Sequence, residues 1–451
     1  MMALCLALSL LPATALATEE GNTGYEDDTA AAAAGMVARI GEQGTEAKYY
    51  DKLKDAVGAA KNGETITLVA DIKNAYSADI EDGRSLKLDL NGYDVGFAEY
   101  QHFNIYNGGL NITGSGELYE EEPYYAPVLL YGSNDADDES YTTVTVGEQV
   151  TLRGWAGLFI DQKEANSGGD NAYGIVATVY GTLESVRDTS GAGGHALYIN
   201  GTIKGTDGEN VPQIVLNRAT LKTAAGNGMY LAGYAETTIT DSTIISNSEG
   251  STGIEIRAGK LTINGNSSVQ GGTGKTDITP NGNGSTTNNV ALAVVQHTTK
   301  LPTEVKINGG TFIGGAALFE QNAQSNDNEA VAKIKIEVNS GNFTGQIFSQ
   351  NKTGFITGGT FSSGVAEYVA ENKYSVGQEN GTFTIRETTT AIKDNAGNYY
   401  VSEAAAQAGS TASVTTEEGT TSYYTSLSAA IAAATSGDTI DLWKDVTASN
   451  A

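Results

Sequence analysis

The chain has 451 residues and a formal net charge of −28, because 54 acidic side chains outnumber 26 basic ones. A surface this acidic repels polyanions at long range, so neither nucleic acid nor an anionic membrane is expected as a partner. Glycine contributes 56 residues and proline only 6, a balance that favours many tight turns between short strands whose amides donate hydrogen bonds.

Residues 1–17 have the features of a signal peptide. They carry no charge, include an apolar run from Ala3 to Leu11, and end in the small-residue pattern Ala15-Leu16-Ala17. The segment is too short to span a membrane, and no later stretch reaches transmembrane length. We therefore expect a secreted or cell-surface protein with no membrane insertion of the mature chain. Cys5, the only cysteine, lies inside this segment, so no disulfide is expected after cleavage.

Residues 36–75 are predicted to form a capping helix and a first strand. Leu53 and Val57 lie at helical spacing, and Gly63 stands where the end of a helix favours a positive φ. From Ile66 the pattern alternates as in a strand. Such a helix would cover the open end of a stack of strands, which otherwise exposes its core and an unpaired edge.

A polar quartet between two apolar residues recurs five times. In each copy the apolar residues lie five positions apart and enclose four residues drawn almost wholly from Asn, Thr, Ser, Asp and Gly, which predicts a strand, a sharp turn and a strand. The pairs are Leu216/Leu221, Ile239/Ile244, Ile307/Phe312, Val338/Phe343 and Ile356/Phe361. Self-similarity of this kind is typical of a solenoid, in which each coil buries its apolar side chains against its neighbours.

The repeats predict an all-β solenoid over residues 76–387, with a monomeric rod as its expected shape. The five apolar pairs should point inward and stack about 4.8 Å apart from coil to coil. Asn217, Asn308 and Asn339 occupy the first quartet position in three coils, and Thr occupies it in the other two. Stacked in register, these side chains should form a ladder of hydrogen bonds.

The module of helix and strand occurs twice. The residues that define it between Tyr49 and Ile72 reappear between Tyr423 and Val446, each shifted by 374 positions. Residues 423–451 are therefore expected to begin a second, incomplete repeat, which leaves open whether the chain is part of a longer repeat protein. Two segments have the composition of linkers, namely the acidic and alanine-rich residues 18–35 and the polar residues 388–422.

Several short motifs carry a resemblance to a known family. They include Asn62-Gly63-Glu64-Thr65-Ile66, Leu88-Asp89-Leu90-Asn91-Gly92 and Gly358-Gly359-Thr360-Phe361. With them the chain resembles large repetitive surface proteins of anaerobic gut bacteria over about residues 36–387. The resemblance implies a bacterial cell-surface location and a right-handed parallel β-helix of the pectate-lyase-like type. Its motifs are structural, so it carries over no catalytic residue.

Enzymes on this scaffold usually cut acidic polysaccharides with clustered aspartates, calcium and a basic residue, or with paired carboxylates. Here Asp161, Asp188 and Asp241 lie on different predicted coils, and Arg187 and Arg218 are the only basic residues that stand out nearby. No catalytic residue is therefore expected, and an exposed structural role is favoured for each of these side chains.

Metal and cofactor sites are not indicated either. His102, His195 and His297 are nearly a hundred residues apart and lack the spacing of metal ligands. The acidic residues 135–139 resemble the opening of a calcium loop but lack its glycine and its distal glutamate. A solvated loop is favoured, and calcium binding there is left open.

A tyrosine-rich segment is the best candidate for a ligand surface. Tyr119, Tyr124, Tyr125, Tyr131 and Trp155 lie among acidic residues, and aromatic faces can stack on sugars while carboxylates accept hydrogen bonds from hydroxyls. The alternative is that they only cover a solenoid edge. We predict a non-catalytic, adhesin-like rod that contacts glycans or host surface molecules. A polysaccharide lyase or glycoside hydrolase on a β-helix, or an inert surface spacer, are the alternatives.

Overall fold

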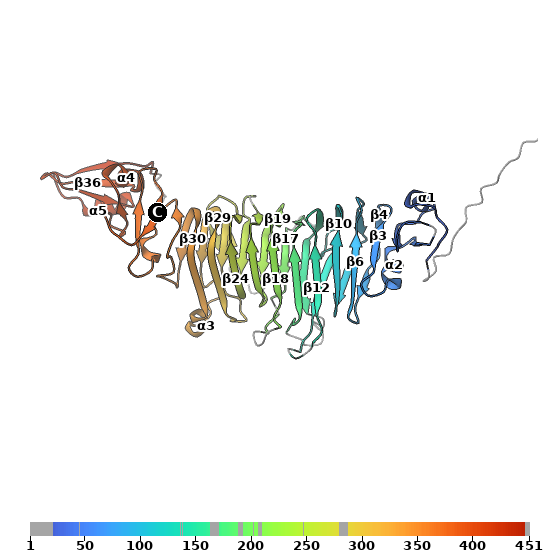
Figure 1. Cartoon of the computed structure of the whole chain (residues 1–451). Coiled ribbons are helices and arrows are strands. Elements are labelled where there is room, and N and C mark those ends of the chain that lie inside the picture. The colour runs from blue at the N-terminus through green and yellow to red at the C-terminus, as the bar shows by residue number, and fades with distance from the viewer. Residues whose placement is uncertain are drawn as a thin grey trace, which may run out of the picture.

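The protein is a long stack of short parallel strands, with helices at both ends (Figure 1). This computed structural model describes residues 21–446, except 45, 136, 138, 163–170, 188–192, 202, 206–209, 247 and 279–286. The signal peptide predicted at residues 1–17 and Asp188 therefore lie outside the described residues. Across these described ranges, no helix combines the length and hydrophobicity needed to cross a bilayer.

Each coil contributes three strands, and strands three apart in the chain pair in parallel, forming three faces. The first face contains β3 (Thr65–Leu68), β6 (Arg84–Asp89), β9 (Gly108–Thr113), β12 (Thr142–Val146), β15 (Ile175–Val179), β18 (Gln213–Asn217), β21 (Glu236–Thr240) and β24 (Gly259–Asn264). The second face contains β4 (Ile72–Ala75), β7 (Val95–Phe97), β10 (Gly116–Glu120), β13 (Val150–Gly154), β16 (Thr182–Ser185), β19 (Thr220–Thr223), β22 (Thr243–Ile245) and β25 (Ser268–Gln270). The third face contains β5 (Ala78–Ile80), β8 (Phe103–Tyr106), β11 (Val128–Gly132), β14 (Ala156–Gln162), β17 (Gly194–Ile199), β20 (Gly226–Leu231), β23 (Thr252–Ile256) and β28 (Val290–Val294).

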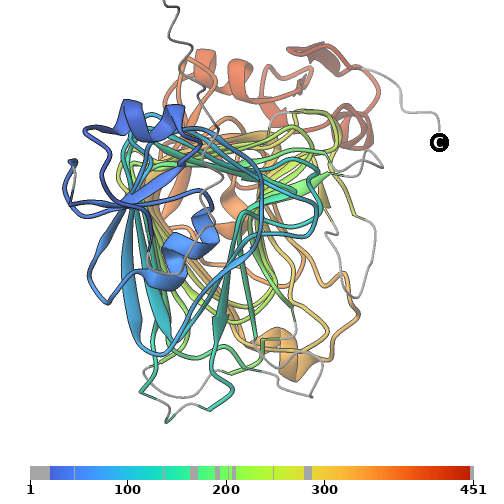
Figure 2. The same cartoon turned by 90° about the vertical axis from the view of Figure 1, so that its right-hand side faces the viewer.

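Two long strands complete the stack. β29 (Thr303–Glu320) and β30 (Ile334–Ser349) run through all three faces, because β29 pairs with β24, β25 and β28 in turn and β30 pairs with β29. Figure 2 looks along the stack and shows the strands of successive coils lying over one another. The molecule is therefore a parallel β-helix, which confirms the predicted solenoid.

The five predicted apolar pairs form two inward columns. Their first members align from Leu216 to Ile356, and their second members align from Leu221 to Phe361. Every one of these side chains is at most 2% exposed. Between the first and the last of these pairs the pattern missed one coil, because Ile263 and Val269 lie six positions apart and their turn holds five residues. This coil lies between the second and third predicted pairs. The pattern also missed earlier coils of the same columns, whose members lie six, six and four positions apart, namely Ile112/Leu118, Val146/Leu152 and Val179/Leu183.

Aromatic stacking shows the separation between coils directly. The rings of Phe312 and Phe343 lie 4.8 Å apart and 6° from parallel, and those of Phe343 and Phe361 lie 4.9 Å apart and 8° from parallel. These values match the expected spacing of about 4.8 Å between hydrogen-bonded strands.

The predicted polar ladder forms along part of the turns. Asn308 Nδ2 donates to Asn264 Oδ1 at 2.9 Å, and Asn339 Nδ2 donates to Asn308 Oδ1 at 3.0 Å. Thr357 Oγ1 continues the ladder to Asn339 Oδ1 at 2.9 Å. Asn264 was not predicted as a member, because it belongs to the coil with the longer turn.

The N-terminal end is closed as predicted, by a short helix. α2 (Leu53–Ala59) buries Leu53, Ala56 and Val57 against the first coil, near β1 (Ala38–Ile40) and β2 (Lys48–Tyr50). The preceding segment corrects a prediction. Residues 21–35 are not a bare linker, because they contain α1 (Asp28–Ala33), whose Asp28 binds Arg39 at 2.8 Å.

The C-terminal end of the stack is closed where strand direction reverses. β31 (Thr360–Phe361) pairs antiparallel with β33 (Phe383–Arg386), which also pairs with β32 (Tyr374–Gly377). The segment predicted as a linker at 388–422 is also ordered, because α4 (Glu403–Gly409) buries alanines in the same core. The other elements are β26 (Asp277–Ile278), β27 (Thr287–Asn288), α3 (Asn328–Ala332), η2 (Ala366–Tyr368), β34 (Ile392–Lys393), β35 (Tyr399–Tyr400), β36 (Ala412–Thr415), β37 (Thr421–Tyr424), α5 (Leu427–Ala433) and β38 (Thr439–Leu442).

Candidate functional site

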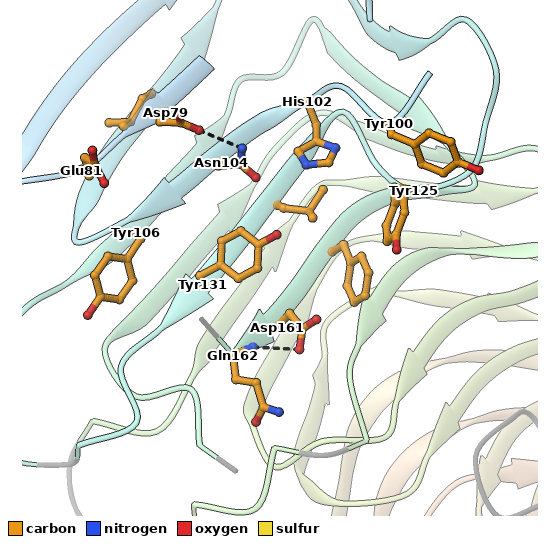
Figure 3. A pocket seen from close by; sticks show the side chains of 13 residues that line it. Asp79, Glu81, Tyr100, His102, Asn104, Tyr106, Tyr125, Tyr131, Asp161 and Gln162 are labelled. Carbon is orange, nitrogen blue, oxygen red and sulfur yellow. Dashed lines mark hydrogen bonds between the residues drawn. The ribbon is translucent and has the colours of Figure 1, made fainter. Parts of the chain in front are cut away.

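A groove of about 730 Å³ lies on the outside of the third face, across β5, β8, β11 and β14 (Figure 3). Strand alternation explains its lining. Side chains such as Ile105, Leu130 and Ile160 point into the core, so the residues between them point outward. The groove is lined by Asp79, Ile80, Glu81, Tyr100, His102, Asn104, Tyr106, Tyr125, Leu129, Tyr131, Phe159, Asp161 and Gln162.

The parallel register assembles the floor from residues that are far apart in sequence. Asp79 pairs with Asn104, whose side-chain amide donates to the Asp79 carboxylate at 2.8 Å. In the neighbouring row, Tyr106 pairs with Tyr131, and Tyr131 pairs with Asp161. Strands β8, β11 and β14 therefore each place two outward side chains, two residues apart, at fixed positions in the groove.

Aromatic rings from two corner loops form one wall of the groove. The ring of Tyr100 stacks on Tyr124 with 4.9 Å between centroids, and it meets Tyr125 edge-on at 6.1 Å. Tyr125 in turn lies nearly parallel to Phe159 at 6.2 Å. Tyr100 and Tyr125 are 51% and 40% exposed, so their faces are available to a ligand. Exposed, mutually supported rings are a suitable platform for stacking.

Asp161 is the half-buried carboxylate of the groove. One of its oxygens accepts hydrogen bonds from the Gln162 backbone N–H at 2.8 Å and from the Asn200 amide at 2.9 Å. Burial raises the pKa of Asp161, although these two hydrogen bonds act in the opposite direction. Figure 3 shows this carboxylate, the Tyr131 ring and the His102 imidazole on the same side of the sheet.

His102 and Tyr131 are neutral hydrogen-bonding groups at pH 7. Burial lowers the pKa of His102, so its imidazole is uncharged, although Asn104 and Asp79 oppose the shift. Burial, together with the charge of Asp161, raises the pKa of Tyr131 to about 12, so its hydroxyl keeps its proton. Within the described part of the chain, His102 Nδ1 has no hydrogen-bond partner.

A buried glutamate fixes the loop that carries Tyr124 and Tyr125. Glu120 ends β10 and is 2% exposed. Its two oxygens accept the Tyr125 backbone N–H at 3.0 and 2.9 Å, and one of them accepts the Trp155 N–H at 3.3 Å. Burial raises the pKa of Glu120 to about 7, against the effect of these N–H groups. Gly154 leaves room for the carboxylate, since a Cβ there would lie 2.8 Å from Glu120 Oε2.

The structure brings together three of the five predicted ligand residues. Tyr125 and Tyr131 line the groove, and Tyr124 supports its rim through Tyr100. Tyr119 lies on the second face, with Arg153 4.8 Å above its ring. Trp155 lies at the corner before β14, where it packs against His195 and Tyr198 at 5.4 and 5.5 Å.

The other residues considered for chemistry do not converge. Asp241 accepts the Asn266 N–H in a turn at 2.8 Å, and Arg218 forms an exposed ion pair with Glu148 at 3.1 Å. In the acidic loop, Asp135 accepts the N–H of Asp137 at 3.0 Å. Among the residues that the structure describes, no group of three His, Cys, Asp or Glu side chains could hold a metal ion.

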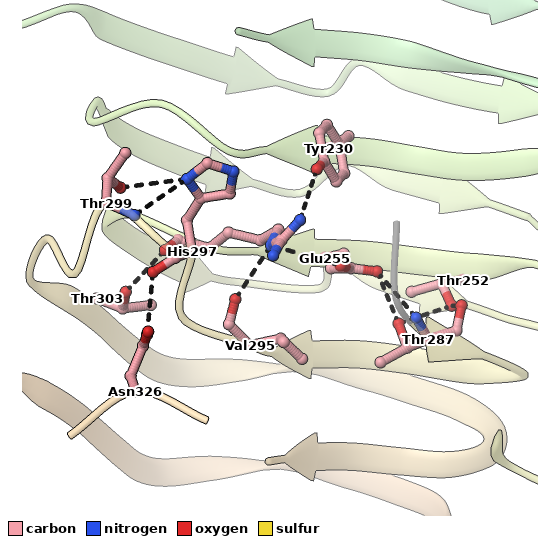
Figure 4. Close-up of polar contacts among 10 residues, drawn as sticks. Tyr230, Thr252, Glu255, Thr287, Val295, His297, Thr299, Thr303 and Asn326 are labelled. Atoms are coloured by element: carbon pink, nitrogen blue, oxygen red, sulfur yellow. Dashed lines mark hydrogen bonds and ion pairs between the residues drawn. The ribbon is translucent and has the colours of Figure 1, made fainter. Parts of the chain in front are cut away.

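A second polar cluster lies farther along the third face (Figure 4). Arg257, Glu255 and Tyr230 are each at most 1% exposed. Arg257 donates to the Tyr230 hydroxyl at 2.9 Å, its Nε lies 3.9 Å from Glu255, and Glu255 accepts the Thr287 hydroxyl at 2.9 Å. Buried charges of this kind must be paired, and here they have partners inside the protein, so the cluster offers no surface to a ligand and the groove is the candidate site.

Fold and groove together define a parallel β-helix protein with an acidic, aromatic groove on one face. Its lining, among the described residues, contains three carboxylates and no Lys or Arg. Comparison with protein families, with characterised proteins and with solved structures finds no match for this chain.

Proposed function

We propose that this chain is a secreted or cell-surface protein that binds neutral glycans in the groove without cutting them. The observation that supports this most is the combination of exposed tyrosine rings with acceptor side chains in one groove. Tyr100 and Tyr125 offer flat faces, and Asp79, Asn104 and Asp161 offer polar atoms beside them. Sugar rings present apolar faces for stacking and hydroxyls for such acceptors, and the groove volume falls within the range of about 300–1,000 Å³ common for ligand pockets.

Charge restricts the class of glycan. Asp79, Glu81 and Asp161 make the lining acidic, and His102 is neutral at pH 7. An anionic polysaccharide would meet repulsion from the groove as well as from a chain with a net charge of −28. Pectate, polygalacturonate and alginate are therefore expected neither to bind nor to be cut, with or without calcium.

Carboxylate spacing favours binding over hydrolysis. Glycosidases place their two carboxyl groups about 5–10 Å apart. Asp161 on β14 is three coil steps from Asp79 on β5 and from Glu81 just beyond it, which places their backbones about 14 Å apart at the usual strand spacing. Burial raises the pKa of Asp161, as a general acid requires, but a partner carboxylate would have to reach it across three coil steps.

The proposed cellular setting rests on features of the sequence. A leader at residues 1–17, a cysteine-free remainder and the resemblance to repetitive surface proteins of gut anaerobes all support an exported, adhesin-like rod. Host or microbial surface glycans are the corresponding partners. An inert spacer would not need a groove lined by exposed tyrosine rings and hydrogen-bond acceptors.

A glycan array probed with the full chain tests the proposal, followed by titration of the strongest neutral oligosaccharide. Tyr125→Ala and Asp161→Asn should each weaken binding about tenfold or more, which corresponds to about 1.4 kcal/mol. Tyr119→Ala is the matched control, because it removes a tyrosine on the second face and should leave affinity unchanged.

Two results would contradict the proposal. Absence of binding to every neutral glycan on the array would favour the spacer alternative. Release of new reducing ends that stops in Asp161→Asn would establish a hydrolase instead.

A further inference from the structure

The C-terminal module repeats the N-terminal cap element by element. β36, β37, α5 and β38 occupy the positions of β1, β2, α2 and β3 shifted by 374 residues. The pairing is also the same. Ala38 lies opposite Tyr50 and Leu68, and Ala412 lies opposite Tyr424 and Leu442.

Small details of the two modules agree as well. After α2, the Lys61 N–H donates to the Glu64 carboxylate at 2.7 Å, and after α5 the Thr435 N–H donates to the Asp438 carboxylate at 2.8 Å. Gly63 and Gly437, which follow these N–H groups, have φ values of 83° and 97°. The second module therefore has the complete local structure of a solenoid cap.

The two copies differ in the exposure of the cap face that, in the N-terminal copy, packs against the first coil. In the N-terminal copy, β3 pairs in parallel with β6, and Val57 and Leu68 are 2% and 0% exposed. In the C-terminal copy, the equivalent Ile431 and Leu442 are 58% and 54% exposed. Within the described part of the chain, β38 pairs only with β36, so its other edge is open.

The same contrast extends beyond the two strands. In the first copy Ile72 begins β4, pairs with β7 and is 8% exposed, whereas its equivalent Val446 is 43% exposed in the second. A contiguous apolar face beside an unpaired strand edge is unstable in water and tends to associate.

We propose that residues 411–446 form an acceptor for one further β-helix coil, which docks on this face with its first strand parallel to β38. The first copy defines the register, because Ile66 lies opposite Leu88 and the equivalent of Ile66 is Ile440. The partner strand therefore places an apolar residue opposite Ile440 and another two residues before it, as Leu86 and Leu88 do in β6.

Two polar positions further define the expected sequence of the partner strand. Arg84 in β6 donates to the carbonyls of Val57 and Ala60 at 2.6 and 3.1 Å and so caps α2. The incoming strand should carry an Arg at the same place to cap α5, giving the pattern Arg-x-Leu-x-Leu. The partner residue that lies opposite Asp441 should not be acidic, although Asp89 holds this position in β6. Like charges placed directly across a sheet are destabilising.

A second copy of this chain does not supply such a strand, since its β6 is already paired with β3 on one side and β9 on the other. The occupant is therefore a coil whose first strand is still free on one edge. This inference is independent of the proposed glycan groove, which lies on other coils.

A chimera tests the inference. Residues 73–387 are appended after Val446, so that the solenoid's own coils follow the second module as they follow the first. In a Cys5→Ser background, Ile431→Cys provides the only thiol, and its rate of maleimide labelling reports exposure. Burial under a docked coil should slow labelling about tenfold or more relative to the unextended chain, because reaction then requires local opening.

Two controls separate docking from general effects. Val215→Cys, exposed on the first solenoid, should label equally fast in both proteins. Replacing the appended Leu86 and Leu88 by Asp should restore fast labelling of Ile431→Cys. Unchanged labelling in the chimera, or an appended segment that stays sensitive to protease while the first solenoid resists it, would overturn the proposal. So would concentration-dependent dimerisation of the unextended chain that protects Ile431→Cys.

Discussion

The buried carboxylate of Glu120 makes the stability of the protein depend on pH in a defined way. The side chain is 2% exposed, faces three backbone N–H groups from Tyr124, Tyr125 and Trp155, and has no cationic partner among the described residues. Burial raises its pKa from 4.5 to about 7, so the folded protein holds the proton more tightly than the unfolded chain does.

The sign and size of the effect follow from this difference. A carboxyl whose pKa is raised on folding binds more protons in the folded state, so stability falls as pH rises between about 4.5 and 7. Below that window the cost is absent, and above it the cost is fully present. At about 1.4 kcal/mol per pH unit, ionised Glu120 destabilises the folded state by about 3 kcal/mol.

Glu120→Gln removes the titration while keeping shape and one acceptor oxygen. The variant leaves one N–H without its acceptor, a constant cost of about 1–3 kcal/mol. Relative to the wild type, its free energy of unfolding should therefore increase by about 3 kcal/mol between pH 4.5 and pH 8. Urea denaturation at several pH values measures this. Glu122→Gln, at an exposed position on the same loop, is the control for loss of a carboxyl. A difference between Glu120→Gln and wild type that stays flat over this range would refute the reasoning.

Two further predictions concern the stack itself. Phe343→Ala removes the central ring of the Phe312–Phe343–Phe361 stack and should lower the free energy of unfolding by about 3–5 kcal/mol. Urea denaturation measures this, and a loss below about 1 kcal/mol would contradict tight packing there. Thr240→Asn places an amide between Asn217 and Asn264, where the ladder is interrupted, and should raise the free energy of unfolding by about 0.5–1.5 kcal/mol. The same change at exposed Thr420 is the control and should not raise it.

The core of the solenoid could be predicted from sequence because inward positions obey a short-range rule. Strand, four-residue turn and strand place two apolar residues five apart, and coils that keep this turn length were all identified. The coil of Ile263 and Val269 was missed because its turn has five residues, and a fixed spacing cannot detect it. The linkers were predicted from composition alone, which cannot show that alanines of α4 pack into the solenoid core and that Ala31 of α1 packs into a small separate cluster.

The groove could be predicted only in part. Tyr124, Tyr125 and Tyr131 were found because they cluster in sequence, but Tyr100, His102 and Asp161 reach them through the register between coils. Loop insertions of different lengths separate those coils, so the sequence does not show that Tyr131 lies beside Asp161. Alternation along β8, β11 and β14 did mark the outward positions, and that is the signal from which the lining could have been found.

The position of the groove follows from what covers the rest of the third face. Beyond β14, the outward row continues through Tyr198, Tyr230 and Glu255, but there the aromatic rings pack on one another and the charges are buried. At β5, β8 and β11 the same row holds Asp79, Asn104 and Leu129, whose side chains are too short to cover the neighbouring coil. The inward columns hold apolar side chains along the whole stack, so the outward residues can change without altering the fold. The proposed ligand surface is therefore confined to the coils where the outward side chains are short and where corner loops add the rings of Tyr100 and Tyr125.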